Sequence, residues 1–264
     1  MLRLSQGHLN LLETCPPKFQ QSYLREANSL PNPEIEDKQV WGSRFHLLMQ
    51  QRELGLPIAS LLQEETELDR SLKALIEAAP ELLINHHSGI REAEHSRTLS
   101  FGNYLLTVVY DLLIAEKNRA KIIDWKTYLQ PQHKNKLARN WQTRLYLYVL
   151  AETSDYLPEQ ISMTYWFVKL PKKPKSHSFT YSQKKHQKTK QDLHNLLTNL
   201  DKWLQQNDLK SFPHHDECES NCPYYQELLY TKTSEAVRDR ANNNFVCDLD
   251  RLQKEIQNAS EIPL

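Results

Sequence analysis

Two aspartates and a lysine stand on neighbouring apolar segments of the chain. Asp111 lies within the run 104–115, and Asp124 and Lys126 lie within the run 121–126. Both runs are rich in Leu, Ile, Val and aromatic residues, which predicts buried strands. Because side chains two positions apart on a strand face the same side, Asp124 and Lys126 should point together.

Charges at the end of a buried strand are costly unless something uses them. A Mg²⁺ ion would use the carboxylates, since it typically takes one or two protein carboxylates and keeps several waters. A metal that activates water, with a lysine that stabilises developing negative charge, suits phosphodiester hydrolysis. An isolated Asp-x-Lys tripeptide is common, however, and alone it more often marks a solvated ion pair.

Two further motifs stand on either side of these strands. A GxxxH motif, Gly42 to His46, precedes them on a predicted helix, and a QxxxY motif, Gln142 to Tyr146, follows them on another. A spacing of four places Gln142 and Tyr146 on one helix face. The ordered series resembles the RecB-like branch of the PD-(D/E)XK nuclease superfamily. Cys15-Pro16, Lys18-Phe19 and the late Cys222-Pro223-Tyr224 are also similar to that branch.

The resemblance spans roughly residues 2–230 and implies a role for each matching position. It implies that the metal ligands are His46, Asp111 and Asp124. It implies that the catalytic and supporting residues are Asp111, Asp124, Lys126, Gln142 and Tyr146. Because an imidazole beside two carboxylates favours Mn²⁺ more than an all-oxygen shell does, the expected cofactor is Mg²⁺ or Mn²⁺.

Two positions near the first aspartate leave questions open. Glu94 sits where family members often carry an acidic residue, but a salt bridge with a neighbour would explain it equally well. The family often has glycine three residues before the first aspartate, and this chain has Val108 there. We expect that valine to narrow the space near a substrate.

The cysteines resemble an incomplete cluster site. Some relatives hold an iron–sulfur cluster with one early and three late cysteines, and Cys15, Cys218 and Cys222 match three of those. The position where relatives carry the fourth cysteine holds no cysteine in this chain. Cys247 could be the fourth ligand only if the C-terminal tail folds back toward the other three. A cluster needs four thiolates or an unusual substitute, so a degenerate site is the competing interpretation. Zinc, with His214 or His215, is a lesser alternative.

A basic stretch follows the predicted strands. Residues 169–190 hold eight lysines and no acidic residue, although the whole chain has a net charge of zero. Beside a nuclease site, such a stretch would neutralise phosphates without reading sequence. The residues expected to bind nucleic acid are Lys172, Lys173, Lys175, Lys184 and Lys185. A solvated hairpin tip without a partner is the alternative.

The pattern predicts an α/β (α+β) fold, and the resemblance implies a restriction-endonuclease-like core. A mixed sheet of about five strands, with its core at 90–182, is flanked by helices in a nuclease domain covering 1–230, and 231–264 form a helical tail. The other expected elements are helices at 5–28, 37–54, 61–79, 135–153 and 183–206, a loop at 29–36, and strands at 161–170 and 177–181.

These observations predict a metal-dependent DNA nuclease, and the resemblance implies exonuclease-like action on single-stranded or end-containing DNA. The resemblance implies work in repair, recombination or CRISPR-related processing, with DNA as substrate and a helicase or other repair or CRISPR proteins as partners. With no signal-peptide core and no long apolar run, we expect a cytoplasmic protein without a membrane partner. The alternative is a catalytically silent module that kept the fold for DNA binding or assembly.

Overall fold

The computed structural model describes residues 1–24, 33–64, 66–83, 89–170, 173–206 and 212–214. Contacts divide the chain into a unit from Met1 to Pro213 and a second unit from His214 to Leu264. The predicted helical tail at 231–264 lies outside the described residues, as do Cys218, Cys222 and Cys247.

The first unit is built on a mixed six-stranded sheet with the order β1-β3-β4-β5-β6, and β2 pairs with β3 off this path. Two pairs are parallel, β1 with β3 and β4 with β5, and the other pairs are antiparallel. The strands are β1 (Leu2–Leu4), β2 (Ile90–Phe101), β3 (Tyr104–Glu116), β4 (Arg119–Lys126), β5 (Ile161–Phe167) and β6 (Lys175–Thr180).

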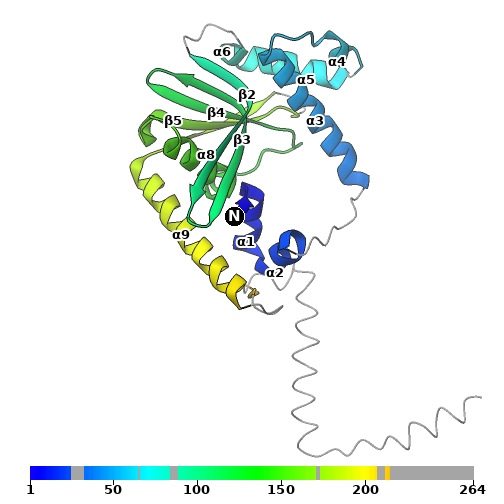
Figure 1. The fold of residues 1–264 in the computed structure, drawn as a ribbon. Helices are drawn as coiled ribbons and strands as arrows, with labels where there is room; N and C mark the ends of the chain where they lie inside the picture. The colour runs from blue at the N-terminus through cyan, green and yellow to red at the C-terminus, as the bar shows by residue number, and fades with distance from the viewer. Residues whose placement is uncertain (25–32, 65, 84–88, 171–172, 207–211, 215–264) are drawn as a thin grey trace, which may run out of the picture. The chain divides into compact units, whose positions relative to one another are not determined.

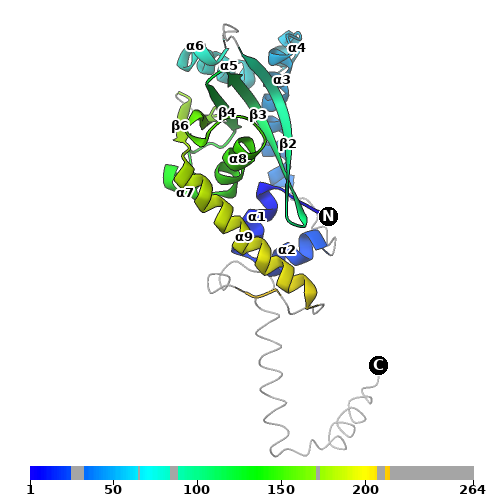
Figure 2. The same cartoon turned by 60° about the vertical axis from the view of Figure 1, so that its left-hand side comes forward.

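Helices cover both faces of this sheet (Figures 1 and 2). Helices α1, α8 and α9 share one hydrophobic core with the sheet, and α3, α5 and α6 share a second core on its other face. The helices are α1 (Gln6–Thr14), α2 (Pro16–Phe19), the π-helix η1 (Gln20–Leu24), α3 (Pro33–Glu53), α4 (Ala59–Glu64), α5 (Thr66–Ala78), α6 (Pro80–Leu83), α7 (Lys134–Arg139), α8 (Trp141–Glu152), the 3-10 helix η2 (Pro158–Gln160) and α9 (Gln183–Gln205).

The strand β4 separates the two cores residue by residue. Ile122 packs in the core under α8, whereas Ile123 and Trp125 pack in the core under α3. This alternation turns Asp124 and Lys126 toward the α8 side, where their charged atoms are 2.7 Å apart. The prediction that these two side chains point together is therefore confirmed.

Several predicted elements differ in detail. The expected sheet lacked β1, because a three-residue strand carries too little pattern to be recognised. The helix expected at 61–79 is two helices, α4 and α5, and the strand expected at 161–170 ends at Phe167. The predicted end of the loop at residue 36 was wrong, because α3 begins at Pro33. Proline is suited to the first position of a helix.

The helix expected at 135–153 is also two helices, α7 and α8, which meet at Asn140. The Asn140 side chain accepts a hydrogen bond from the backbone N–H of Gln142 at 2.8 Å, which caps α8. Asn10 from α1 donates to the same oxygen at 3.1 Å and accepts from the N–H of Trp141 at 3.1 Å. The start of α8, and with it Gln142, is thereby fixed against α1.

No helix in the described part of the chain combines the length and the hydropathy needed to cross a membrane.

Candidate active site

A notch in the sheet exposes the middle of β3. Because β2 occupies one edge of β3, β1 and β4 share the opposite edge. There, β1 pairs with β3 up to Leu106, and β4 pairs with β3 from Leu112 onward. A cavity of about 300 Å³ opens there. It is lined by Gln6, His46, Glu94, Val109, Asp111, Asp124, Trp125, Lys126, Thr127, Tyr128, Gln142 and Tyr146.

The two strands that carry Glu94 and Asp111 are irregular at these positions. The β2–β3 ladder pairs Ala93 with Leu112 and His95 with Tyr110, but Glu94 and Asp111 between them do not pair. Glu94 has a φ of 52°, a left-handed conformation that costs an ordinary residue roughly 1–2 kcal/mol. Such strain persists where the surrounding structure imposes it, and often at functional sites.

The alternation of β3 shifts at the same point. Tyr110 packs in the core under α8, but Leu112, two residues later, packs in the core under α3. A regular strand would put both on one face. The shift at Asp111 therefore brings its carboxylate into the notch, where its Oδ2 accepts a hydrogen bond from the backbone N–H of Trp125 at 2.7 Å.

Helix α3 brings the imidazole to this point. Gly42, one turn before His46, lies so close to the segment after β4 that a Cβ atom there would be 3.0 Å from Thr127 Oγ1. Phe45 is fully buried, and its ring meets that of Trp125 edge-on at 6.3 Å between centroids. This close approach leaves His46 Nδ1 3.4 Å from Asp111 Oδ1 and 4.0 Å from Glu94 Oε1.

Asp124, Lys126 and Gln142 form a closed triangle beside this group. Lys126 Nζ lies 2.7 Å from Asp124 Oδ2 and donates to Gln142 Oε1 at 2.8 Å. Gln142 Nε2 donates to Asp124 Oδ1 at 2.5 Å. The Asp124 side chain is only 3% exposed. One amide thus fixes the positions of both the carboxylate and the ammonium group.

Tyr146 lines the cavity one helical turn after Gln142. Its side chain is buried, and its backbone carbonyl accepts a hydrogen bond from the Tyr110 hydroxyl at 3.0 Å. Burial and the charges of Asp124 and Asp111 raise the pKa of Tyr146, so its hydroxyl remains protonated and available as a donor.

The crowded charges shift the pKa of several groups. Burial and the charge of Asp111 raise the pKa of Asp124 to about 6, against the opposing effect of Lys126. Burial, together with the charge of Asp111, also raises the pKa of Glu94. Burial lowers the pKa of His46, but its hydrogen bond to Asp111 and the surrounding carboxylates more than offset this and raise it.

The pKa of Lys126 is shifted in the direction that favours its charged form. Burial lowers its pKa, but the charge and the hydrogen bond of Asp124 outweigh that effect, so the pKa is raised. Lys126 therefore remains an ammonium group at neutral pH. It can donate hydrogen bonds and stabilise negative charge, but it cannot act as a general base.

The donor set fits a divalent cation. One ligand atom each from His46, Glu94 and Asp111 lie within 4.8 Å of one another. Burial and the charge of Asp111 together raise the pKa values of Glu94 and Asp124, and a bound cation would relieve the repulsion among these carboxylates. Of the predicted ligands, the structure brings His46 and Asp111 together and adds Glu94, whose role the sequence left open. Asp124 lines the same cavity, but its oxygens face Gln142 and Lys126.

A larger groove continues from the cavity. It encloses about 1340 Å³ and shares His46, Glu94, Thr127 and Tyr128 with the cavity. Tyr128 and Leu129, in the loop after β4, are 50% and 59% exposed. Neither residue was among the site residues predicted from the sequence. An aromatic and a leucine directly after the DxK motif, in a loop that also holds Pro131, were the available signal.

The predicted basic stretch does not form one surface beside the cavity. Lys175 starts β6 opposite Phe167, whose other neighbour is Lys126, so it lies at the same end of the sheet as the site. Lys184 and Lys185 begin α9 after Thr180, which pairs with Ser162 at the other end of β5.

Two further lysines of that stretch have different settings, and a third is not described. Lys173 is exposed in the loop before β6, and Lys172 lies outside the described residues. Lys169 lines the groove, with its Nζ 4.2 Å from the centre of the Trp41 ring and 3.6 Å from a carboxylate oxygen of Glu67.

Val108 and Cys15 were also expected to lie at or near functional sites. Val108 is 1% exposed and belongs to the core under α8, so the expectation that it narrows the substrate space was wrong. Its neighbour Val109 lines the cavity instead. Cys15 is half-buried at the end of α1, where its N–H donates to the Leu11 carbonyl at 2.8 Å, and the expected cysteine partners lie outside the described residues.

Comparison with known proteins identifies the family of the chain. A family profile described as the PD-(D/E)XK nuclease superfamily matches residues 3–226. No curated protein matches the chain. Among solved structures, SSO0001 is 12% identical, with 75% of this chain and 76% of that chain covered and a TM-score of 0.37. A presumed exonuclease from Eubacterium rectale is 11% identical, with 83% and 88% covered and a TM-score of 0.48. Because the family profile spans nearly all of the first unit, the chain belongs to the PD-(D/E)XK nuclease superfamily.

Proposed function

We propose that this protein is a metal-dependent deoxyribonuclease of the RecB-like branch that hydrolyses phosphodiester bonds. The observation that carries the proposal is the gathering of an imidazole, three carboxylates and an ammonium group around one open cavity. His46 comes from α3, Glu94 from β2, Asp111 from β3, and Asp124 and Lys126 from β4.

We assign cation binding to His46, Glu94 and Asp111, with Asp124 adding negative charge from the adjacent strand. When bound, Mg²⁺ or Mn²⁺ would neutralise charge on a phosphodiester and make a water molecule more acidic. An oxygen-rich set with one imidazole accepts either ion and favours Mn²⁺ somewhat more than carboxylates alone do.

The remaining residues orient the reacting groups. Lys126 keeps its proton and places an ammonium group where negative charge would develop on the phosphate. Gln142 forms hydrogen bonds with both Asp124 and Lys126 and so fixes their positions relative to each other. Tyr146 offers a hydroxyl that stays protonated at neutral pH and can donate to a phosphate oxygen or a water.

The groove next to the cavity supports a single-stranded or end-containing DNA substrate and exonuclease-like action. Bases of a single strand have free faces that stack on exposed aromatic side chains, and Tyr128 is half-exposed at the site. Lys169 and Lys175, at the same end of the sheet, would neutralise backbone phosphates.

We also propose the wider context that the family membership suggests. Residues 1–230 would form the nuclease domain, and 231–264 would form a separate helical tail. DNA repair, recombination or CRISPR-related processing would be the setting, with a helicase or another repair or CRISPR protein as partner. Cys15, Cys218 and Cys222 would be either a remnant of an iron–sulfur site or part of one, which an absorption spectrum of anaerobically purified protein would decide.

Cleavage of end-labelled single- and double-stranded DNA with Mg²⁺ or Mn²⁺ tests the proposal. We expect metal-dependent products from the parent protein and about a 10²–10³-fold lower rate from Lys126→Ala, which removes one stabilising donor. Lys121→Ala is the matched control, because Lys121 lies on the same strand at its other end. Equal rates for Lys126→Ala and Lys121→Ala would refute the site assignment.

A catalytically silent protein would give a different result. It would form no product with either metal, and its DNA binding would survive EDTA and weaken with salt. Equivalent RNA substrates in the same assay separate a ribonuclease from a deoxyribonuclease.

A further inference from the structure

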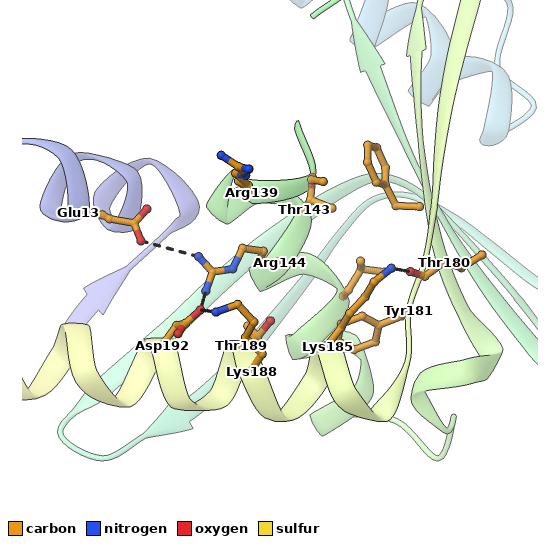
Figure 3. A pocket seen from close by; sticks show the side chains of 13 residues that line it. Glu13, Arg139, Thr143, Arg144, Thr180, Tyr181, Lys185, Lys188, Thr189 and Asp192 are labelled. Atoms are coloured by element: carbon orange, nitrogen blue, oxygen red, sulfur yellow. Dashed lines mark hydrogen bonds and ion pairs between the residues drawn. The ribbon is translucent and has the colours of Figure 1, made fainter. Parts of the chain in front are cut away.

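A second cavity lies on the outer side of α8, away from the candidate active site. It encloses about 510 Å³ between α1, α7, α8, β6 and α9 (Figure 3). Helix α8 separates the two sites: Gln142 and Tyr146 line the first, whereas Thr143, Arg144 and Leu147 line the second. Within the described residues, the two cavities share no lining residue.

The lining of this cavity is positively charged on balance. Four basic side chains and two carboxylates contribute, a surplus of two positive charges. The basic residues are Arg139, Arg144, Lys185 and Lys188, and the acidic residues are Glu13 and Asp192.

Both carboxylates are already committed to Arg144. Its guanidinium lies 2.5 Å from Asp192 and 3.8 Å from Glu13, as the dashed lines of Figure 3 show. The same group sits 3.9 Å from the centre of the Trp141 ring. Arg144 is therefore held at the cavity wall by two carboxylates and an aromatic ring.

Arg139 and Lys185 supply the surplus of two, because Arg144 and Lys188 lie beside the two carboxylates. Arg139 is exposed and makes no ion pair with any residue that the structure describes. Lys185 donates to the Thr180 carbonyl at 2.6 Å, which leaves further ammonium hydrogens free to donate. Lys188 lies 3.2 Å from Asp192, which it shares with Arg144.

The walls between these charges are largely apolar. Ala138, Leu147, Phe179 and Tyr181 form them, and Thr143 and Thr189 line the cavity beside them. A cavity of roughly 300–1,000 Å³ with apolar walls and a few convergent polar groups is typical of a small-molecule site. A flat ring system fits such walls, and the basic side chains mark where its anionic end would lie.

We propose that this cavity binds a nucleotide through a terminal phosphate, with the base against the apolar wall. A phosphate monoester carries about −1.5 to −2 charges at pH 7, which matches the surplus of two, whereas a diester within a strand carries only one. Arg139 is suited to bidentate phosphate binding, and Lys188 adds a point charge. The ligand is either a free mononucleotide or the 5′-phosphorylated end of a strand, since both present the same group.

Calorimetric titration of the full chain with deoxyadenosine 5′-monophosphate in EDTA tests this inference. EDTA removes any divalent cation, and the Asp111→Asn variant removes a ligand of the first site, so binding there is separated from binding here. We expect binding to survive both changes, and deoxyadenosine without phosphate to bind at least about tenfold more weakly, as expected for losing one charge-assisted hydrogen bond.

Surface variants locate the site. Arg139→Ala and Lys188→Ala should each weaken binding about tenfold. Lys202→Ala, on the same α9 but outside the cavity lining, should leave it unchanged. A 5′-phosphorylated oligonucleotide, compared with its unphosphorylated form, shows whether strand ends also bind.

Three results would overturn the inference: no binding at millimolar nucleotide, loss of binding in Asp111→Asn, or equal weakening by Lys202→Ala. None of them depends on whether the first site cleaves DNA, so the inference and the proposed function can fail separately.

Discussion

Glu94 and Asp111 occupy matching positions on β2 and β3, yet the ladder between these strands is interrupted at this pair. At the interruption, Glu94 has a left-handed backbone conformation. Asp111 lies where the side chains of β3 cease to alternate regularly between the two faces of the sheet. The two carboxylates and His46 consequently come within reach of a single ion. The irregularity of the strands is what assembles the candidate metal site.

The first prediction separates backbone strain at Glu94 from its charge. Glycine adopts positive φ freely, so Glu94→Gly should be more stable than Glu94→Ala by about 1 kcal/mol. Both variants lose the carboxylate and should bind Mn²⁺ more weakly than the parent. Urea unfolding measures the first effect and calorimetry the second. Equal stabilities for the two variants would show that position 94 is unstrained in solution.

The second prediction concerns the close approach at Gly42. A methyl group there would press on Thr127 Oγ1, so Gly42→Ala should push α3 away and lower Mn²⁺ affinity about tenfold through His46. Removing the obstructing oxygen with Thr127→Ala should restore much of that affinity in the double variant, because the two positions are coupled. Additive losses in the double-mutant cycle would contradict the steric explanation.

The third prediction is that metal affinity rises with pH. Metal ligands must be deprotonated to bind, so protons compete with the ion. The pKa values of His46 and Glu94 are both raised, and that of Asp124 lies at about 6, so protons stay bound to higher pH than usual. Mn²⁺ affinity should therefore increase from about pH 6 to about pH 8, with proton release.

Calorimetry in buffers of different ionisation enthalpy measures that proton release directly. His46→Ala removes one competing proton and should flatten the pH dependence while lowering the affinity. A flat profile in the parent protein would show that these groups do not bind the ion.

The fourth prediction concerns the ion pair of Asp124 and Lys126. Lys126→Met leaves a buried carboxylate without its partner and should destabilise the metal-free protein by about 3 kcal/mol. The double variant Asp124→Asn with Lys126→Met removes both charges and should recover part of this loss, since no buried charge is left unpaired. Urea unfolding in EDTA provides the measurement, and a double variant less stable than Lys126→Met would contradict this account.

The order of most elements and the family of the fold could be predicted from the amino-acid sequence. Successive side chains of β4 point to opposite faces of the sheet, which is a local property of any strand. The convergence of Asp124 and Lys126, two positions apart, could therefore be predicted. The four-residue spacing of Gln142 and Tyr146 is equally local, since it follows from the helix repeat. The short β1 and the break at Asn140 carry weaker patterns and were missed.

Which side chains from distant parts of the chain come together depends on the three-dimensional fold. The inclusion of Glu94 depends on an interruption of the β2–β3 ladder, and no local preference of the sequence specifies a left-handed glutamate. The split of the lysine stretch between two ends of the sheet depends on the direction of β6, which reverses the chain between Lys175 and Lys185. Long-range pairing sets these relationships, because contacts between segments far apart in the chain are determined by packing of the whole core rather than by neighbouring residues.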